Sequence, residues 1–315
     1  MTETVVLDHV TKSYGPFDAI KDATFQLNAG ENIALVGHNG AGKTTMIKLM
    51  LGLIRPTKGN VRVLGEDPAA GAFAARVRLG YLPEHVSFNL ALTGMETLAF
   101  YARLKNVAHS DLAGLLDRVG LSHAAKRRVG TYSKGMRQRL GLAQALLGQP
   151  SVLLLDEPTT GLDPALRQSF YDVLEHLRQD GATILMSSHA LTELESKVGR
   201  VIIANQGQII ADGSIDALRR ISKLPLRIRV QLDGTPALPE SAGQSPLNWR
   251  SMGSGLFETH ALAQDKMELV RGLVVGNENL AELDVIPPTL DELYAHFLNA
   301  ESNSGAAALV KEAAE

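Results

Sequence analysis

One stretch of the chain restricts the possible fold more than any other. Residues 37–44, Gly-His-Asn-Gly-Ala-Gly-Lys-Thr, match the phosphate-loop pattern GxxxxGK[ST]. A short apolar run, 33–36, stands before them, and a run with helical patterning, 43–53, comes after and stops at Arg55-Pro56. This context of buried strand, glycine-rich loop and helix predicts an α/β fold with an anion site at the loop.

The residue types of the loop suit a nucleoside triphosphate. Glycines let backbone N–H groups surround phosphate oxygens, and the helix N-terminus adds partial positive charge. Lys43 places a cation on the β- and γ-phosphates, and the Thr44 hydroxyl can ligate Mg²⁺. An ordinary glycine-rich turn is the alternative, but it leaves the lysine and the threonine without a purpose. The residues predicted to hold the nucleotide here are Gly37, Asn39, Gly40, Ala41, Gly42, Lys43, Thr44 and Thr45.

A second apolar run ends in two acids. Residues 152–155 are Val-Leu-Leu-Leu, and Asp156 and Glu157 follow directly. Carboxylates at the C-terminal end of a parallel strand lie where open α/β sheets place their ligands. We therefore expect Asp156 to hold Mg²⁺ and Glu157 to orient and deprotonate an attacking water. A strand that ends in a solvated acidic turn is the alternative for this segment taken alone.

Composition narrows the function classes. The 315 residues include no cysteine, which excludes a disulfide scaffold, a thiolate metal site and a cysteine nucleophile. The net charge of −3 is too small to indicate a nucleic-acid partner. No run approaches the roughly 18 apolar residues that span a bilayer, and residues 1–4 lack the features of a signal peptide. We expect a cytoplasmic chain that reaches the membrane only through a partner.

The pattern changes along the chain in a way that predicts two domains. Residues 88–147 read as mainly helical, with Thr93 and Glu96 as a capping box. After residue 222 the pattern becomes that of a small α+β domain: strands near 226–232, 256–262 and 280–286, a loop at 233–246, and helices near 265–275 and after Pro288. The predicted domains are 1–222 and 223–298, with a flexible tail at 299–315.

Four further stretches identify the family that the first domain resembles. Tyr-Ser-Lys-Gly-Met at 132–136 is similar to the LSGGQ signature of ABC ATPases, and Gly-Leu-Asp-Pro at 161–164 is similar to their D-loop. Ser-Ser-His at 187–189 is similar to the switch-histidine motif, and Lys-Ser-Tyr-Gly at 12–15 to the loop whose aromatic ring stacks on adenine. The order and spacing of all these motifs resemble the ABC cassette over residues 1 to about 220.

The resemblance implies a fold and a mechanism. The fold is α/β: a P-loop NTPase cassette with a RecA-like core, an antiparallel β subdomain and an α-helical subdomain, followed by the small α+β accessory domain. The activity is hydrolysis of ATP with Mg²⁺ by a head-to-tail homodimer that holds two nucleotides in its seam. Tyr14 would stack on adenine, Ser133 and Gly135 would face the γ-phosphate of the other subunit, Asp163 would organise the seam, and His189 would contact the γ-phosphate.

Two departures from the family pattern concern the site. In the signature, Tyr132, Lys134 and Met136 replace the usual leucine, glycine and glutamine, while Ser133 and Gly135 remain. In addition, Glu84 occupies the position of the Q-loop glutamine, which places a carboxylate near the metal instead of an amide.

The resemblance also predicts partners. The membrane domains of a transporter are not in this chain, so a separate integral membrane permease is expected, with the ATPase on the inner face of the cell membrane. The ending looks like that of ABC-2 type exporter ATPases. Residues 81–88 and 132–140 resemble the ATPase subunits of transporters that mature the copper sites of nitrous oxide reductase, which would add a periplasmic accessory protein. A drug or lipid exporter ATPase and, further off, a soluble ABC ATPase are the alternatives.

Overall fold

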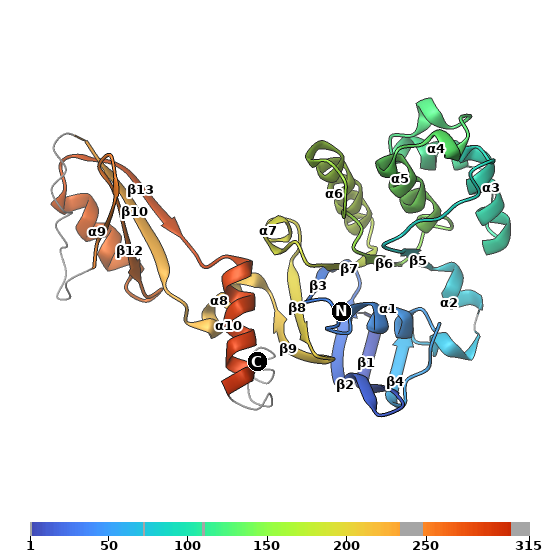
Figure 1. The fold of residues 1–315 in the computed structure, drawn as a ribbon, viewed down its shortest axis with the longest axis horizontal. Helices are drawn as coiled ribbons and strands as arrows, with labels where there is room; N and C mark the ends of the chain where they lie inside the picture. The colour runs from blue at the N-terminus through green and yellow to red at the C-terminus, as the bar shows by residue number, and fades with distance from the viewer. Residues whose placement is uncertain (1, 72, 109–110, 234–247, 304–315) are drawn as a thin grey trace. The chain divides into compact units, whose positions relative to one another are not determined.

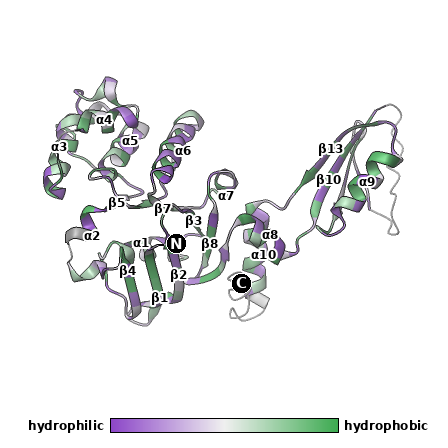
Figure 2. Ribbon diagram, turned by 180° about the vertical axis from the view of Figure 1, so that it is seen from behind, coloured by the Kyte–Doolittle hydropathy of each residue, from purple (hydrophilic) through white to green (hydrophobic). Residues whose placement is uncertain are grey.

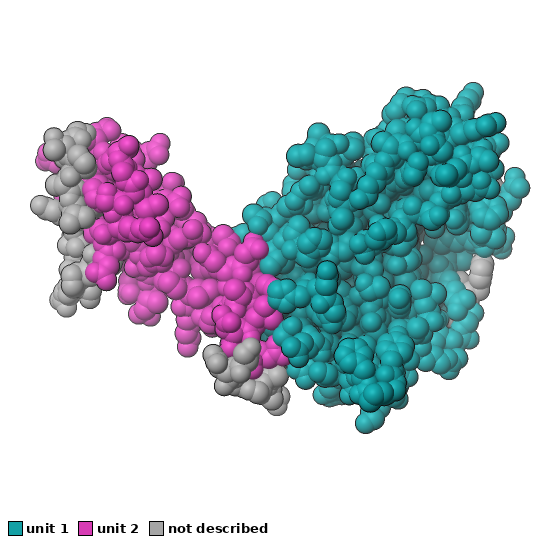
Figure 3. Space-filling view, viewed as in Figure 1, with its two compact units in different colours: residues 1–213 teal, residues 214–315 magenta. Residues whose placement is uncertain are grey.

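The computed structural model describes residues 2–71, 73–108, 111–233 and 248–303. The chain divides into two compact units, Met1–Gly213 and Ser214–Glu315 (Figure 3). The sequence predicted this boundary near residue 222. The difference is α8 (Ile215–Ser222), which falls in the second unit and packs there on α10 (Leu290–Asn303).

The core of the first unit is a six-stranded sheet. Every residue of β3, β6 and β7 is buried, as the apolar runs at 33–36 and 152–155 predicted for β3 and β6. The strands β5, β6, β7, β3 and β8 run parallel, and β9 returns antiparallel to β8 through a turn at Gln206-Gly207. The order across the sheet is β5 (Leu79–Leu82), β6 (Val152–Asp156), β7 (Thr183–Ser188), β3 (Asn32–Val36), β8 (Arg200–Asn205) and β9 (Gln208–Gly213).

A second, antiparallel sheet has the order β2-β1-β4 (Figure 1). It consists of β1 (Glu3–Tyr14), β2 (Phe17–Asn28) and β4 (Lys58–Val63). The two long strands continue well beyond the short apolar runs visible in the sequence, because irregular positions at His9 (φ 50°) and Asp22 (φ 51°) interrupt the alternation of buried and exposed residues. Their hairpin places Tyr14 opposite Phe17.

The helix after the phosphate loop, α1 (Lys43–Met50), is shorter than the predicted 43–53. It ends because Gly52 adopts a left-handed conformation (φ 67°) and lies against the backbone of Pro68, where no side chain would fit. The longer α6 (Pro164–Gln179) alternates green and purple in Figure 2, and its buried face is formed by Phe170, Tyr171, Leu174 and Leu177. Short elements complete this part of the unit: η1 (Pro68–Ala70), α2 (Phe73–Val77) and α7 (Leu191–Leu194).

The helical region forms as predicted. It contains α3 (Gly94–Lys105), η2 (Ser122–Ala124), η3 (Val129–Thr131), α4 (Leu112–Arg118) and α5 (Lys134–Ala145). Thr93 and Glu96 make the predicted capping box at the start of α3. Gly120 takes a positive φ of 68° just past the end of α4, as expected of a residue that terminates a helix. None of the described helices is long and apolar enough to cross a membrane.

The second unit contains a four-stranded antiparallel sheet of order β11-β12-β10-β13. Its elements are β10 (Leu226–Leu232), β11 (Arg250–Gly253), β12 (Leu256–Ala261), α9 (Lys266–Gly276) and β13 (Leu280–Ile286). In the chain, α8 precedes these elements and α10 follows them. Leu226, Ile228, Val230 and Leu232 are buried in strict alternation, as predicted. The fully exposed β11 was not predicted, because it has no apolar alternation.

The last helix continues further than the sequence indicated. Thr289 and Glu292 cap α10 by reciprocal hydrogen bonds, and the helix runs to Asn303, into the segment predicted as a tail from 299. The rest of that predicted tail, 304–315, and all but the first residue of the predicted loop 233–246 lie outside the described residues.

Candidate active site

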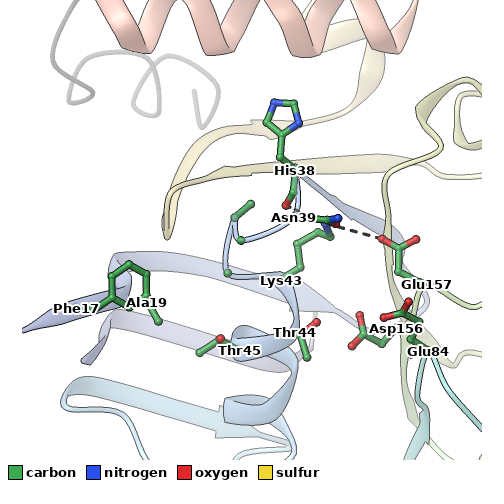
Figure 4. A pocket seen from close by; sticks show the side chains of 13 residues that line it. Phe17, Ala19, His38, Asn39, Lys43, Thr44, Thr45, Glu84, Asp156 and Glu157 are labelled. Atoms are coloured by element: carbon green, nitrogen blue, oxygen red, sulfur yellow. Dashed lines mark hydrogen bonds and ion pairs between the residues drawn. The ribbon is translucent and has the colours of Figure 1, made fainter. Parts of the chain in front are cut away.

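The phosphate loop connects the end of β3 to the start of α1 and borders a cavity of about 280 Å³ (Figure 4). Seven of the eight predicted loop residues line this cavity, together with all three predicted acids of the site. The lining is Phe17, Ala19, His38, Asn39, Gly40, Ala41, Gly42, Lys43, Thr44, Thr45, Glu84, Asp156 and Glu157. Gly37 lies behind it, against the backbone of Ala204, where a larger residue would not fit.

The backbone of the loop fits a phosphate group. Gly40 and Gly42 have φ values of 86° and 102°, which favour glycine. Gly42 is the N-cap of α1, and no side chain caps this helix. The first N–H groups of the helix therefore have no side-chain acceptor and can donate to phosphate oxygens.

Lys43 is held at the bottom of the site. Its Nζ donates to the carbonyl oxygens of Gly37 (2.5 Å) and His38 (3.3 Å) and lies 3.9 Å from Glu157 Oε1. Burial lowers the pKa of Lys43, and the negative charges of Glu157, Asp156 and Glu84 oppose this effect. The ammonium group is thus preorganised beside the loop.

The two acids at the end of β6 share one hydroxyl group. Ser187 Oγ donates to Asp156 Oδ1 (2.6 Å) and accepts from the backbone N–H of Glu157 (3.0 Å). The parallel pairing of β6 with β7 places Asp156 directly beside Ser187. Glu157 has a left-handed backbone (φ 47°), an unfavourable conformation for a non-glycine residue that often marks functional sites. The sequence showed Ser187 only as part of a motif, and its bond to Asp156 depends on strand register.

The structure brings the two predicted catalytic residues together. His189 Nδ1 lies 2.8 Å from Glu157 Oε2, and the other carboxylate oxygen of Glu157 faces Lys43. The His189 side chain is 60% exposed, whereas that of Glu157 is 11% exposed. The carboxylate is therefore fixed between a buried cation and an accessible imidazole.

Oxygen ligands for a metal ion lie at the same edge. Thr44, Asp156 and Glu84 all line the cavity, and Glu84 follows β5, the strand beside β6. Among the described residues no three His, Asp or Glu side chains form a metal cluster by themselves. A hydroxyl and carboxylates at a phosphate site suit Mg²⁺, which usually takes one or two protein ligands and completes its shell with phosphate and water.

The signature and D-loop residues do not line this cavity. Ser133 and Asp163 are N-caps, accepting from the backbone N–H of Met136 (3.2 Å) and Leu166 (2.9 Å). Gly135 lies against the Leu166 side chain: a Cβ atom on this glycine would stand 2.8 Å from Leu166 Cδ1. The starts of α5 and α6 are therefore packed together, apart from the phosphate loop of the same chain.

The structure explains one departure in the signature. Tyr132 is 3% exposed, and its hydroxyl donates to the carbonyl oxygen of Ala124 (2.7 Å). Tyrosine in place of leucine therefore fills the helical region and ties it to the turn at η2.

The predicted adenine-stacking residue stands at the tip of the β1–β2 hairpin. Tyr14 is 50% exposed, with Lys12 Nζ 5.1 Å from its ring centroid, and it is not part of the cavity lining. Phe17, its partner across the hairpin, does line the cavity. The sequence analysis did not single out Phe17, and the turn Gly15-Pro16 between two aromatic residues is the signal that could have found it.

A phosphate loop after β3, an acid and a histidine paired directly after β6 and β7, and a helical region in the same unit define a P-loop ATPase cassette. Residues 20–160 match the family model described as ABC transporter. The chain is 36% identical over 80% of its length to an uncharacterized ABC transporter ATP-binding protein, YxlF, of Bacillus subtilis, covering 85% of that protein. This protein belongs to the family of ABC transporter ATP-binding subunits.

Further similarities agree with this assignment. The chain is 32% identical over 94% of its length to a daunorubicin resistance ATP-binding protein of Streptomyces coeruleorubidus, of which it covers 96%. A solved structure titled ATP binding subunit of ABC transporter shares 30% identity at a TM-score of 0.65, over 69% of this chain and 92% of the other. A nucleotide-free ATP-binding cassette, at 22% identity and a TM-score of 0.61, shows the same fold over 68% of this chain and 92% of the other.

Proposed function

We propose that this protein is the ATP-hydrolysing subunit of an ABC-2 type exporter, and that two copies bind head to tail around two Mg-ATP molecules to drive a separate membrane permease. The observation that carries the proposal is the fixed position of the Glu157 carboxylate, between Lys43 and His189 at the phosphate loop. The proposed homodimer would act at the cytoplasmic face of the membrane, where the permease is reached.

The chemistry follows from the positions of these groups. The N–H groups of the loop and Lys43 bind and orient the phosphates, so that the γ-phosphate faces Glu157. Glu157 accepts a proton from the attacking water, and His189 holds the carboxylate in place and contacts the γ-phosphate. A bound Mg²⁺ would neutralise charge on the phosphate oxygens, held through Thr44, Asp156 and Glu84. Adenine would stack on Tyr14.

A groove beside Glu84 is the proposed contact with the permease. A cavity of about 550 Å³ lies between the segment after β5 and helices α3 and α5. Its lining is Arg76, Leu79, Gly80, Tyr81, Pro83, His85, Val86, Ser87, Tyr101, Leu104, Lys105, Gln144, Ala145 and Leu147. Glu84 belongs to the nucleotide cavity while its neighbours Pro83 and His85 belong to this groove, so movement of one segment would couple nucleotide to permease.

The relatives favour a drug-like cargo. Relatives of this chain include a daunorubicin resistance protein, a doxorubicin resistance protein of Mycobacterium tuberculosis (39% identical, over 68% of this chain and 67% of the other) and a linearmycin resistance protein of Bacillus subtilis (33% identical, over 66% of this chain and 68% of the other). We therefore propose export of a drug-like molecule. Maturation of nitrous oxide reductase, with a periplasmic accessory protein, is a second candidate and rests on the resemblance of segments 81–88 and 132–140 alone.

The second unit is proposed to act in assembly or regulation and not in chemistry. Its buried cluster is small and apolar, centred on Ile228, Val230, Phe257 and Leu273. Its removal should leave ATP binding by the first unit intact and weaken dimerisation or coupling.

The test is ATP hydrolysis by the subunit purified with its membrane permease. Lys43→Ala should reduce ATP affinity at least about a hundredfold, because the loop loses its cation. Lys48→Ala, at an exposed position of the same helix, is the matched control and should bind ATP as the parent does. Affinity of Lys43→Ala within a few-fold of the parent, or failure of any permease to co-purify, would count against the proposal.

A further inference from the structure

The nucleotide cavity of one chain is poor in positive charge. Its lining contains three carboxylates, those of Glu84, Asp156 and Glu157, and a single lysine, Lys43, with no arginine. Lys43 already lies within the field of all three acids. A triphosphate adds several more negative charges, of which a bound Mg²⁺ neutralises only part. The described lining thus leaves the γ-phosphate short of cations, and a second chain could supply one.

Lys134 is a cation for which the described residues provide no anionic partner. It is the first residue of α5, is exposed and does not line the cavity. Within the described part of the chain, its ammonium group makes no hydrogen bond or ion pair. The end of the side chain instead lies across Gly161: a Cβ atom on that glycine would stand 3.0 Å from Cε and 3.4 Å from Cδ of Lys134. The side chain is therefore placed against the loop before α6.

Electrostatics alone does not favour a lysine at this position. The N-terminus of a helix carries partial positive charge, so a cation there is unfavourable. The first turn of α5 contains no acid to offset this cost. Between Asp117 and Asp156 the sequence has no acidic residue at all, and seven basic ones: Arg118, Lys126, Arg127, Arg128, Lys134, Arg137 and Arg139. An anion from outside the chain would relieve this repulsion.

We propose that Lys134 binds the γ-phosphate of the ATP held on the phosphate loop of a second copy, as an additional cation of the composite site. This inference rests on the head-to-tail dimer of the proposed function. Two contacts hold the first half of α5, and with it the backbone of Lys134: Gly135 packs on Leu166, and Gln138 Nε2 donates to the carbonyl oxygen of Pro158 (3.0 Å). The lysine that replaces the signature glycine thereby strengthens ATP-dependent dimerisation and distinguishes ATP from ADP.

The first experiment measures dimerisation of the full chain by sedimentation, in a Glu157→Gln background that retains bound ATP. Lys134→Met should weaken dimerisation with Mg-ATP about tenfold or more, the size of one charge-assisted contact, and leave the affinity of the separate chains for ADP unchanged. Lys134→Arg should retain most of the effect. The matched control is Lys126→Met, an exposed lysine in the same basic stretch, which should dimerise as the parent does.

The second experiment decides whether Lys134 acts on its own nucleotide or on that of the partner. A tagged Lys134→Met chain is mixed with Lys43→Ala, or with a chain carrying both substitutions, and ATP-dependent association is measured. In the first pair, the Lys134→Met chain keeps an intact phosphate loop, and the Lys43→Ala chain can present its intact Lys134 to it. In the second pair, neither chain has Lys134. It should therefore associate more strongly than the second pair.

The outcomes separate the inference from the function that it rests on. Parental dimerisation by Lys134→Met, or equal association of the two mixed pairs, would overturn the role of Lys134. Absence of any ATP-driven dimer in the Glu157→Gln parent would instead contradict the proposed dimer.

Discussion

Replacement of Ser187 by alanine tests whether the two acids of the site depend on one shared hydroxyl. In the structure this hydroxyl donates to buried Asp156, which is 4% exposed, over 2.6 Å and accepts the N–H of Glu157 over 3.0 Å. The substitution removes both bonds and adds no bulk. It leaves a buried carboxylate oxygen without its donor and a left-handed residue without its backbone acceptor.

The expected loss can be worked out from these two bonds. A hydrogen bond to a charged group contributes about 1.5–3 kcal/mol, and a neutral one about 1 kcal/mol. Ser187→Ala should therefore lower the free energy of unfolding by about 3 kcal/mol. Ser188→Ala is the matched control, because among the described residues that buried hydroxyl accepts one neutral hydrogen bond, from the N–H of Ala190 (3.0 Å), and its loss should cost about 1 kcal/mol.

The assay is urea denaturation followed by circular dichroism, together with the ATPase rate. The sole tryptophan, Trp249, lies in the second unit, so its fluorescence follows that unit separately. Ser187→Ala should move the dichroism transition and reduce kcat by misplacing Glu157. A loss no larger than that of Ser188→Ala, with normal kcat, would refute the reasoning.

Three other predictions follow from the site and its surroundings. In the reconstituted complex, Glu84→Gln should keep its ATPase activity, whereas Glu84→Ala should no longer be stimulated by the permease. Unchanged stimulation of Glu84→Ala would contradict the proposed role of Glu84 in coupling the nucleotide to the permease. Burial lowers the pKa of Lys105 to about 8 from 10.5, so between these pH values the folded chain binds fewer protons than the unfolded chain. The free energy of unfolding should therefore rise by about 3 kcal/mol as the pH increases through this range. Lys105→Met should abolish this rise in melting experiments at different pH values. Tyr14→Ala should weaken ATP binding about fivefold if that ring stacks on adenine, and a larger loss in Phe17→Ala would transfer the role to the ring that lines the cavity.

Much of the fold could be predicted because its core strands and helix starts have recognisable patterns within short stretches of sequence. The runs at 33–36 in β3 and 152–155 in β6 are apolar throughout since both faces of the sheet are covered, and β10 alternates since one face is not. The capping boxes of α3 and α10 are likewise readable, because both partners lie three residues apart.

What could not be predicted depends on contacts between distant segments. The end of α1 at Met50 is set by Gly52 meeting Pro68, and the position of α8 by its packing on α10. The same holds for the site: motif residues were visible, but the shared hydroxyl of Ser187 and the position of Phe17 depend on strand register. Exposed β11 carries too little apolar patterning to be recognised.

The role of Glu157 is tested most directly by three measurements on the variant Glu157→Gln, of which the hydrolysis rate is decisive. An amide keeps the shape of the side chain but cannot accept the proton of the attacking water. The variant should bind Mg-ATP with parental affinity, hydrolyse it at least about a hundredfold more slowly, and accumulate as an ATP-bound dimer in sedimentation. Turnover at the parental rate would contradict the role of the carboxylate that the structure holds between Lys43 and His189.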